Sequence, residues 1–275
     1  MENKKVILKL NNMIKSQVKK RPSSKCKTPY VADIINLNTN EELICHAPSL
    51  GCCGYVDKDE YVFVVENEVK KTCSHNVQLA LRQEKGEEYL IGVHPKQAEN
   101  IVSLCLQKGY IKGLENITCL QREKKFLNSR FDFVCKDENN TLTIIEVKNV
   151  PCGDYEDIYF KDRLKKDYST REINTKVAYF PDGYRKKKND TVSPRALKHI
   201  TELEQLKKEQ SNIRTIIIFV VQRPDCVLFQ GSNVDPIYKN ALNNAYDNGV
   251  EVIPIQVVWE LDGSCVYKNI LPFSK

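Results

Sequence analysis

The hydrophobic pattern of this 275-residue chain changes its period once, near residue 93, and this change limits the folds open to it. Between about residues 28 and 92 lie short runs rich in β-branched and aromatic residues, such as YVADIINL and YVFVVENE, separated by Asn, Asp and Gly. Such runs are typical of short strands, and this many of them favour a small barrel or sandwich. After residue 93, strand-like and helical runs alternate, which indicates an α/β domain that continues to the end of the chain.

Local signals place the helices and the central strand of this second part. A helical run that begins after His94 ends before Gly109, and a second run begins with Ser193 as its cap and Pro194 in its first turn. Residues 216–221 are apolar on both faces and predict a central strand. A third helix is expected to have its apolar stripe at Ile237, Ala241 and Ala245.

Composition excludes a membrane-spanning chain and leaves a polyanionic partner open. The chain has 42 basic and 36 acidic residues, a net charge of +6, which permits a polyanionic partner without requiring one. No apolar run approaches the roughly 18 residues that span a bilayer. The N-terminal residues MENKKVILKL lack a long apolar segment with a cleavage site, so no secretory signal is expected. We therefore expect an intracellular protein, cytoplasmic or nuclear, with no membrane partner.

The chain has eleven cysteines, which we expect to be reduced thiols because export is not predicted. Some stand in apolar segments, where cysteine behaves as a small hydrophobic residue: Cys105, Cys119, Cys135 and Cys226. A second group of cysteines clusters in the sequence with two histidines: Cys45, His46, Cys52, Cys53, Cys73 and His75. Because no Cys-x-x-Cys pair occurs among them, a zinc site is the less favoured interpretation.

The distribution of charge divides the chain further. Residues 1–24 are basic and predict an N-terminal tail, with a short amphipathic helix over residues 5–14. Residues 25–92 form the strand-rich domain, and residues 93–275 form the α/β domain. Within the latter, residues 153–192 are a charged insertion rich in Lys and Arg, which indicates a functional insertion or a partly disordered segment.

Two strand-like runs around the turn at residues 137–140 carry the most informative polar residues. The runs SRFDFVC and TLTIIEVKNV predict a β-hairpin, in which pairing of residue 132 with residue 146 places Asp132 opposite Glu146 on one face. Two carboxylates so placed repel each other unless a cation lies between them, and their oxygens suit Mg²⁺ or Mn²⁺. Lys148 stands two residues further on, where it can orient a water or stabilise charge on a phosphate. The alternative is an edge hairpin with a salt-bridged surface.

Further blocks extend this pattern, and together with it they resemble the sugar fermentation stimulation protein A (SfsA) family over about residues 93–258. The similarity begins with Glu123 followed nine residues later by Asp132 within EKKFLNSRFDF, and continues with IEVKNV at residues 145–150. The later blocks are FPD at residues 180–182, Arg195 with Lys198-His199 and Glu202-Leu203, FVVQR at residues 219–223 with Asp225-Cys226 and Asp235-Pro236, and GVEV at residues 249–252.

This resemblance implies a specific mixed α/β (α+β) architecture and a specific site. It implies an N-terminal OB-like β-barrel over residues 25–92 and a PD-(D/E)xK nuclease-like mixed sheet flanked by helices over residues 93–275. It also implies that Asp132, Glu146 and Glu123 are metal ligands, that Val147 offers its backbone carbonyl, and that Lys148 is the catalytic lysine. Mg²⁺ or Mn²⁺ is the expected cofactor.

The nucleic-acid-binding residues expected from the resemblance and from the basic runs are Arg130, Arg195, Lys198, His199, Arg185, Lys186, Lys187 and Lys188. Three of them, Arg195, Lys198 and His199, fall on a helix face that the residue pattern alone describes as solvent-exposed. The resemblance instead places this face in the cleft, in contact with phosphate.

Two functions follow from these residues. The first is a divalent-metal-dependent nuclease that hydrolyses phosphodiester bonds by metal-activated water. The alternative is a non-catalytic DNA-binding protein, like a transcription regulator, in which the same acids are inert or hold a structural ion. A protein-interaction module that uses the charged insertion is a third, less favoured interpretation. DNA or RNA, single or double strand, and the oligomeric state are all left open.

Overall fold

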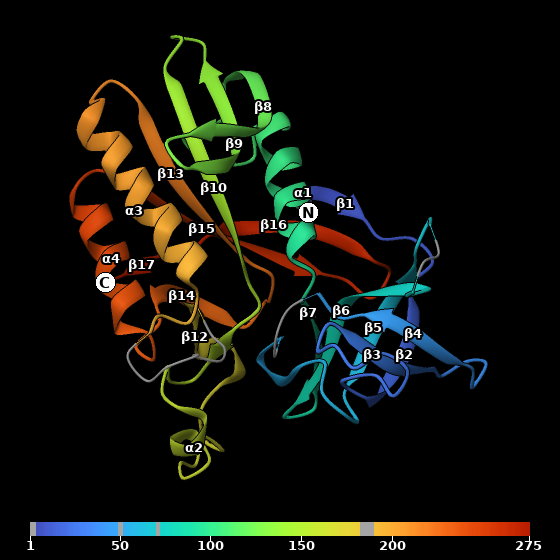
Figure 1. Cartoon of the computed structure of the whole chain (residues 1–275). Helices are drawn as coiled ribbons and strands as arrows, with labels where there is room; N and C mark the ends of the chain where they lie inside the picture. Colours follow the sequence, from blue (N-terminus) through green and yellow to red (C-terminus); the bar gives the residue numbers. More distant parts are fainter. Residues whose placement is uncertain (1–3, 49–51, 70–71, 182–189) are drawn as a thin grey trace.

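The computed structural model describes residues 4–48, 52–69, 72–181 and 190–275, which form three β-sheets and the helices that pack on them (Figure 1). The helices are α1 (Pro95–Gln107), α2 (Phe160–Arg163), α3 (Pro194–Glu209) and α4 (Pro236–Asp247), with short 3₁₀ turns η1 (Cys52–Gly54) and η2 (Ile173–Thr175). Within the described part of the chain, no helix combines the length and the apolar character needed to cross a membrane. The fold is a mixed α/β architecture in which strands predominate, in agreement with the predicted fold class.

The N-terminal sheet contains six strands in the order β4-β3-β2-β5-β6-β7. Its strands are β2 (Ile14–Lys20), β3 (Val31–Asn36), β4 (Glu42–His46), β5 (Tyr61–Glu66), β6 (His75–Glu84) and β7 (Glu87–Gly92). Strand β4 also pairs with β6 in parallel, through Cys45 with His75 and His46 with Asn76. A core of small and β-branched side chains, including Val18, Ile34 and Val62, lies inside this sheet. The more specific OB-like barrel stays a prediction.

The seven-stranded sheet of the C-terminal part has the order β1-β16-β15-β13-β10-β9-β8. Its strands are β1 (Val6–Lys9), β8 (Ile117–Phe126), β9 (Ser129–Asp137), β10 (Leu142–Val150), β13 (Arg214–Val221), β15 (Glu251–Trp259) and β16 (Ser264–Ile270). Strand β13 runs parallel to both β10 and β15, and its apolar residues are buried on both faces, as predicted.

Alternate residues of β13 divide the core into two layers. Figure 1 shows α1 on one side of β13 and α3 and α4 on the other. Ile216, Ile218 and Val220 pack with α1 on one face of the sheet. Ile217, Phe219 and Val221 pack with α3 and α4 on the other. The predicted helical spacing of α1 and the predicted cap of α3 are confirmed, since the Ser193 side chain accepts a hydrogen bond from the N–H of Ala196.

A third, four-stranded sheet accommodates part of the charged insertion. Its order is β11-β12-β14-β17, and its strands are β11 (Gly153–Asp154), β12 (Lys176–Phe180), β14 (Cys226–Gly231) and β17 (Phe273–Ser274). Between β11 and β12 the chain forms a projection that carries α2, seen at the bottom of Figure 1. The insertion is therefore structured over residues 153–181.

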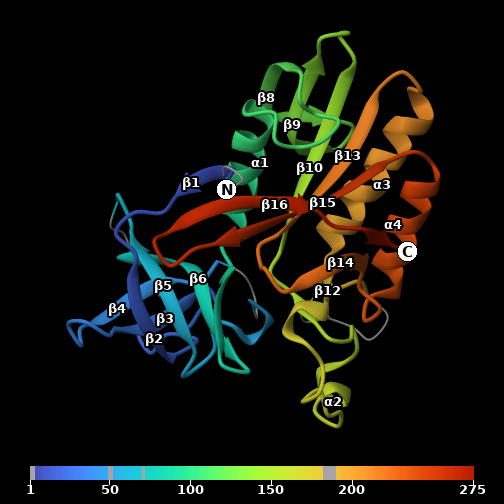
Figure 2. The ribbon, with the colours of Figure 1, turned by 180° about the vertical axis from the view of Figure 1, so that it is seen from behind.

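The predicted N-terminal tail and its short helix are wrong. Residues 6–9 form β1, which pairs antiparallel with β16 of the seven-stranded sheet, and residues 14–20 form β2 in the N-terminal sheet. Figure 2 shows β1 alongside β16 before the chain enters the N-terminal sheet. The short apolar run at residues 6–8 is consistent with either a helix or a strand, and the open edge of β16 decides between them because it supplies hydrogen-bond partners.

Three other expectations are corrected. Helix α4 buries Tyr238, Leu242 and Ala245, while Ile237 is 41 % exposed, so its apolar stripe is shifted by one residue at its start. Cys119 is exposed because it lies on the edge strand β8. The cysteines are not all reduced, since Cys53 and Cys152 form a disulfide.

This disulfide and a close backbone contact join the N-terminal sheet region to the C-terminal part. Cys53 lies in η1, and Cys152 lies two residues beyond the end of β10. At the end of β7, the N–H of Gly92 donates to the carbonyl of Gln222, 2.9 Å away. A Cβ at residue 92 would lie 2.1 Å from the Gln222 side chain, so only glycine permits this approach.

Candidate active site

The β9–β10 hairpin places Asp132 and Glu146 one step beyond its last paired residues, Phe133 and Ile145. At this point the Asp132 side chain takes the place of a backbone carbonyl of β9 as the hydrogen-bond acceptor for β10. Its Oδ2 atom accepts a hydrogen bond from the N–H of Val147, at 2.7 Å. The strands separate here because a side chain has taken the place of a ladder hydrogen bond, and the two carboxylates are held beside each other at the opening.

Glu146 is the more buried of the two carboxylates, at 2 % exposure. Its Oε1 atom accepts a hydrogen bond from Nζ of Lys148 and also contacts Nδ1 of His199. Its Oε2 atom is buried and has no hydrogen-bond partner among the described residues. Burial alone would raise the pKa of Glu146, but Lys148 and His199 outweigh it and lower the pKa below its usual value. Glu146 is therefore a carboxylate with one unused oxygen.

The pKa of Asp132 is shifted in the opposite direction. Burial and then the nearby Glu146 carboxylate raise the pKa of Asp132 to about 6, although the Val147 N–H and Lys148 act against this rise. A raised pKa means that the folded chain disfavours the second negative charge. Within the pair it is Asp132 that is under-compensated, because Lys148 and His199 both bind Oε1 of Glu146.

Helix α3 closes one side of the site. His199 is 4 % exposed and packs against the ring of Phe131, with 5.8 Å between ring centroids. Lys198 donates to the carbonyl of Asn128 in the β8–β9 turn, at 2.8 Å, and lies 3.7 Å from Glu202. The face of α3 that the pattern alone describes as solvent-exposed is therefore partly buried, because the β8–β9 turn covers it.

Several residues predicted for the site lie at its margin, and others lie outside the described residues. Arg130 and Arg195 are exposed, on β9 two residues before Asp132 and in the first turn of α3. Glu123 is exposed on β8 between Arg122 and Lys124, with a φ of 53°. The four basic residues 185–188 lie outside the described residues.

A third acidic ligand is not gathered with the pair. In the described chain, no three His, Cys, Asp or Glu side chains converge as a metal site requires. Glu123, Asp132 and Glu146 therefore do not form a group, and neither do the cysteines and histidines near residue 45. The role of Glu123 and of the Val147 carbonyl stays a prediction.

Two residues that the sequence analysis did not single out act on the pair. Glu99 of α1 adds a further negative charge that raises the pKa of Asp132. Tyr238 of α4 is fully buried, and its hydroxyl has no partner among the described residues. Burial first, and then the Glu146 carboxylate, raise the pKa of Tyr238. Neither residue carries a local signal, since both are brought to the site by helix packing.

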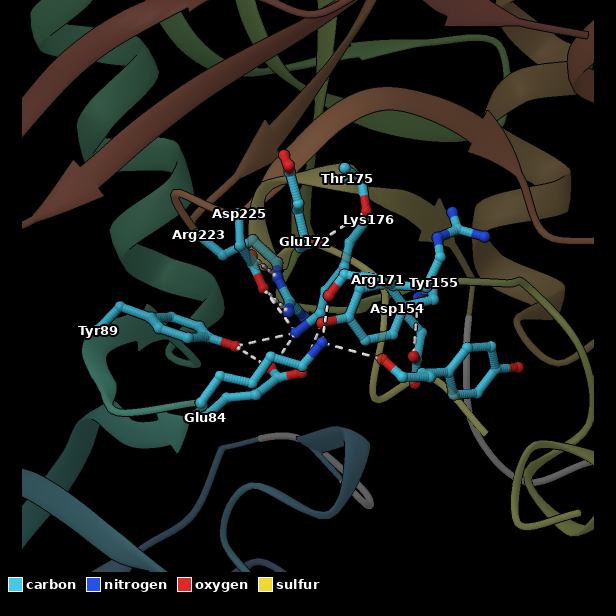
Figure 3. A network of polar contacts seen from close by, with 12 residues as sticks. Glu84, Tyr89, Asp154, Tyr155, Arg171, Glu172, Thr175, Lys176, Arg223 and Asp225 are labelled. Atoms are coloured by element: carbon cyan, nitrogen blue, oxygen red, sulfur yellow. Dashed lines mark hydrogen bonds and ion pairs between the residues drawn. The ribbon is translucent and has the colours of Figure 1, made fainter. Parts of the chain in front are cut away.

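A second buried ionic cluster lies between the N-terminal sheet and the C-terminal part (Figure 3). Arg223 is 1 % exposed and binds Asp225 through two hydrogen bonds of 2.6 Å, while its third nitrogen donates to Tyr55 at 2.8 Å. Lys176 forms ion pairs with Asp225, at 3.1 Å, and with Glu84 of β6. We call Arg223, Asp225, Lys176 and Glu84 the interdomain cluster.

In the interdomain cluster each charge has an opposite partner. Tyr89 accepts a hydrogen bond from Lys176 at 3.1 Å, and Tyr155 of the insertion donates to Glu84 at 2.8 Å. The cluster thus connects β6 and β7 with the insertion and with the loop after β13. It has the balanced charges of a structural contact.

Comparison with known proteins identifies the relatives of the chain. A family model described as "Sugar fermentation stimulation protein RE domain" matches residues 96–163 and 166–263, more than half of the chain. The chain belongs to the sugar fermentation stimulation protein family. A sugar fermentation stimulation protein homolog of Shewanella baltica is 29 % identical over 230 residues, which cover 82 % of this chain and 83 % of the relative. A homolog of Clostridium perfringens is 27 % identical over 246 residues, which cover 89 % and 90 %.

The fold of this family member also matches a solved structure. SfsA of Pyrococcus furiosus, solved in complex with Ca²⁺, superposes with a TM-score of 0.76 at 16 % identity, over 98 % of this chain and 99 % of that one. At this identity the match shows a shared fold. It includes both the N-terminal sheet and the C-terminal part, because nearly the whole of each chain is covered.

Proposed function

We propose that this family member is a divalent-metal-dependent nuclease that hydrolyses phosphodiester bonds, with Mg²⁺ or Mn²⁺ as the cofactor. The observation that carries the proposal is the pair of Asp132 and Glu146, with Asp132 under-compensated and an unpartnered buried oxygen on Glu146. Carboxylate oxygens are the ligands that these hard cations prefer. That the related Pyrococcus furiosus protein was solved with Ca²⁺ supports a divalent cation in this fold.

The residues of the site divide the chemistry among them. Asp132 and Glu146 would hold the cation, and the family resemblance implies the Val147 carbonyl as a further ligand. Glu123, also implied by the resemblance, is exposed on β8 and does not join the pair in the described chain. The bound cation supplies charge stabilisation at the phosphate and an acidified water. Lys148 is positioned by its contact with Glu146 and places a positive charge where charge develops on the phosphate. His199 holds Oε1 of Glu146 from the opposite element, α3, and so fixes the direction of Oε2.

A specific observation favours the second function, nucleic-acid binding without cleavage. Oε1 of Glu146 already contacts both Lys148 and His199, and in the described chain no third acid joins the pair. In such a site Lys148 can compensate the charge of Glu146 without a metal ion. A nuclease fold can then serve as a binding module that does not cleave. The two functions share the substrate and differ in whether bonds break.

Incubation with labelled single- and double-stranded DNA and RNA, in Mn²⁺, Mg²⁺ or EDTA, tests the proposal. The Glu146→Gln variant is the test, and Glu84→Gln in the interdomain cluster is the matched control. We expect cleavage that needs the metal, persists in Glu84→Gln and falls at least about 100-fold in Glu146→Gln. Binding with no cleavage by the wild-type protein in any metal would instead establish the second function.

A further inference from the structure

The Cys53–Cys152 disulfide is the one cysteine pair bonded in the described chain, and it stands among free thiols. Eight other cysteines of the described chain are unpaired, and Cys119 among them is exposed. A single bridge in a chain that keeps its other cysteines as thiols is the pattern of an exchangeable pair rather than of a fold built on disulfides.

The two sulfurs of the bridge differ in their access to solvent. Cys53 lies in η1 and is half-buried, whereas Cys152 is 6 % exposed. Thiol–disulfide exchange begins when a thiolate reaches one sulfur of the bond, and the other sulfur then leaves. The geometry therefore directs an incoming thiolate to Cys53 and makes Cys152 the leaving group.

The guanidinium of Arg223 lies beside the leaving sulfur. A Cβ added to Gly153 would lie 3.1 Å from Cζ of Arg223, and Nη1 of Arg223 donates to the carbonyl of Pro151 at 3.0 Å. The positive charge thus lies against the residues on either side of Cys152. A nearby arginine stabilises a thiolate, and a more stable thiolate leaves faster.

The same nitrogen of Arg223 also holds together the two segments that the bridge joins. It donates to the hydroxyl of Tyr55 at 2.8 Å, in addition to its bond with Pro151. Tyr55 follows Cys53 by two residues, and Pro151 directly precedes Cys152. Neither hydrogen bond involves sulfur, so both persist when the bridge is reduced. The two thiols then stay close together and can form the bond again.

A third sulfur lies close to the bridge and does not compete with it. A Cβ added to Gly153 would lie 2.6 Å from Sγ of Cys226. Cys226 is 3 % exposed, and burial raises the pKa of its thiol to about 12. It therefore stays protonated near neutral pH and does not attack the bridge, since the thiolate is the reactive form.

We propose that the Cys53–Cys152 bridge is a reversible exchange site for a dithiol reductant, which enters at Cys53 and releases the covalent tie between η1 and the end of β10. A thiolate of the reductant bonds to Sγ of Cys53, the S–S bond breaks, and Sγ of Cys152 leaves as a thiolate. The second thiol of the reductant then attacks the mixed disulfide and frees Cys53. The reductant is oxidised to its disulfide, and its two thiol protons pass through solvent to Cys53 and Cys152. This inference is independent of the proposed function, because it involves neither the carboxylate pair nor nucleic acid.

Trapping with oxidised glutathione tests the direction of attack. The variants Cys152→Ser and Cys53→Ser each leave one thiol of the pair, and peptide mass spectrometry measures how fast that thiol gains glutathione in the folded protein. We expect Cys53 to react at least about 10-fold faster than Cys152, because it is the accessible sulfur. The exposed Cys119, present in both variants, is the reference for the reagent. Equal rates, or a faster reaction at Cys152, would overturn the inference.

A second measurement keeps every cysteine and tests the role of Arg223. The protein is reduced with dithiothreitol in native buffer, and re-formation of the bridge in oxidised glutathione is followed by alkylation. The test variant Tyr55→Phe removes the hydroxyl that Arg223 binds, and Tyr61→Phe on β5 is the matched control. We expect the reduced protein to keep its far-UV circular dichroism, and re-formation to be about 5-fold slower in Tyr55→Phe alone, as loss of one hydrogen bond implies.

Three results of this second measurement would contradict the inference. The first is the absence of a Cys53–Cys152 peptide from protein purified without reductant. The second is reduction that proceeds only as fast as the whole chain unfolds, because the bridge would then be closed to a reductant in the folded protein. The third is an equal rate of re-formation in Tyr55→Phe and Tyr61→Phe.

Discussion

Two buried ionic clusters in this protein contain similar residues and differ in their balance. The interdomain cluster joins two cations, Arg223 and Lys176, to two acids, Asp225 and Glu84. The candidate site places Lys148 and His199 on Glu146, while Asp132 has neither as a hydrogen-bond partner and Glu99 adds further negative charge near it. Arg223 and Lys176 lower the pKa of Asp225 although burial opposes them, whereas burial and Glu146 raise the pKa of Asp132.

The difference separates a contact that stabilises the fold from a site that is available for chemistry. A buried pair with complete hydrogen bonding holds its neighbours in one arrangement, and removal of one member leaves an uncompensated charge. A group with excess like charge and an unpartnered buried oxygen lowers the stability of the fold. Acids whose pKa values are strongly perturbed in this way concentrate at functional sites. Four substitutions or treatments test this comparison.

The largest effect is expected from Arg223→Met. The substitution leaves Asp225 buried without its bidentate partner, so we expect the free energy of unfolding to fall by about 3–5 kcal/mol. Urea denaturation measures the change, with the exposed Arg195→Met as the control, for which about 0.5 kcal/mol or less is expected. A loss below about 1 kcal/mol would show that the interdomain cluster does not stabilise the fold.

Loss of the Cys53–Cys152 disulfide is expected to have the next largest effect. The bridge joins residues 99 apart in the sequence, beside the same interface, and restricts the unfolded chain. Reduction, or Cys53→Ser, should lower the free energy of unfolding by about 2–4 kcal/mol. The control is Cys119→Ser, which removes an exposed free thiol. Equal stability of the oxidised and reduced protein would contradict the expectation.

The pH dependence of stability should reveal the interdomain cluster. The pKa of Asp225 is lowered in the folded chain, so its stabilising contribution is present above the unfolded pKa of about 4 and is lost as pH falls through the folded pKa. Between pH 5 and pH 3 we expect the wild-type protein to lose about 1 kcal/mol more stability than Asp225→Asn. Parallel denaturation profiles for the two proteins would be inconsistent with this assignment.

The smallest effect, and one of opposite sign, is expected from Asp132→Asn. The substitution removes one of two repelling carboxylates, and the amide oxygen can still accept the Val147 N–H. We expect the metal-free protein at pH 7.5 to gain about 1 kcal/mol of stability or to stay unchanged. A clear loss, comparable to that of Asp225→Asn, would place the two clusters in the same structural class.

The sequence predicted those parts of this protein whose signals are local. The spacing of apolar residues predicted α1, the cap at Ser193 predicted α3, and the apolar run at residues 216–221 predicted the central strand β13. The polar turn at residues 137–140 predicted the hairpin that carries Asp132 and Glu146. The family resemblance is confirmed by the match over residues 96–163 and 166–263.

Features that depend on distant partners were not predictable in the same way. Residues 6–9 became a strand because the edge of β16 was available, and Cys53 met Cys152 across an interface. The charge balance of the interdomain cluster depends on Glu84 and Lys176, which lie 92 residues apart. Glu99 and Tyr238 reach the carboxylate pair through helix packing, which no spacing rule within one segment describes.

The proposed nuclease function requires that the pair of Asp132 and Glu146 binds a divalent cation. Calorimetric titration of the wild-type protein with Mn²⁺, beside Asp132→Asn, Glu146→Gln and the interdomain control Glu84→Gln, tests it directly. We expect one binding event in the wild-type protein and in Glu84→Gln, and none in the two site variants. Binding that survives both Asp132→Asn and Glu146→Gln, or that is absent from the wild-type protein, would contradict the account.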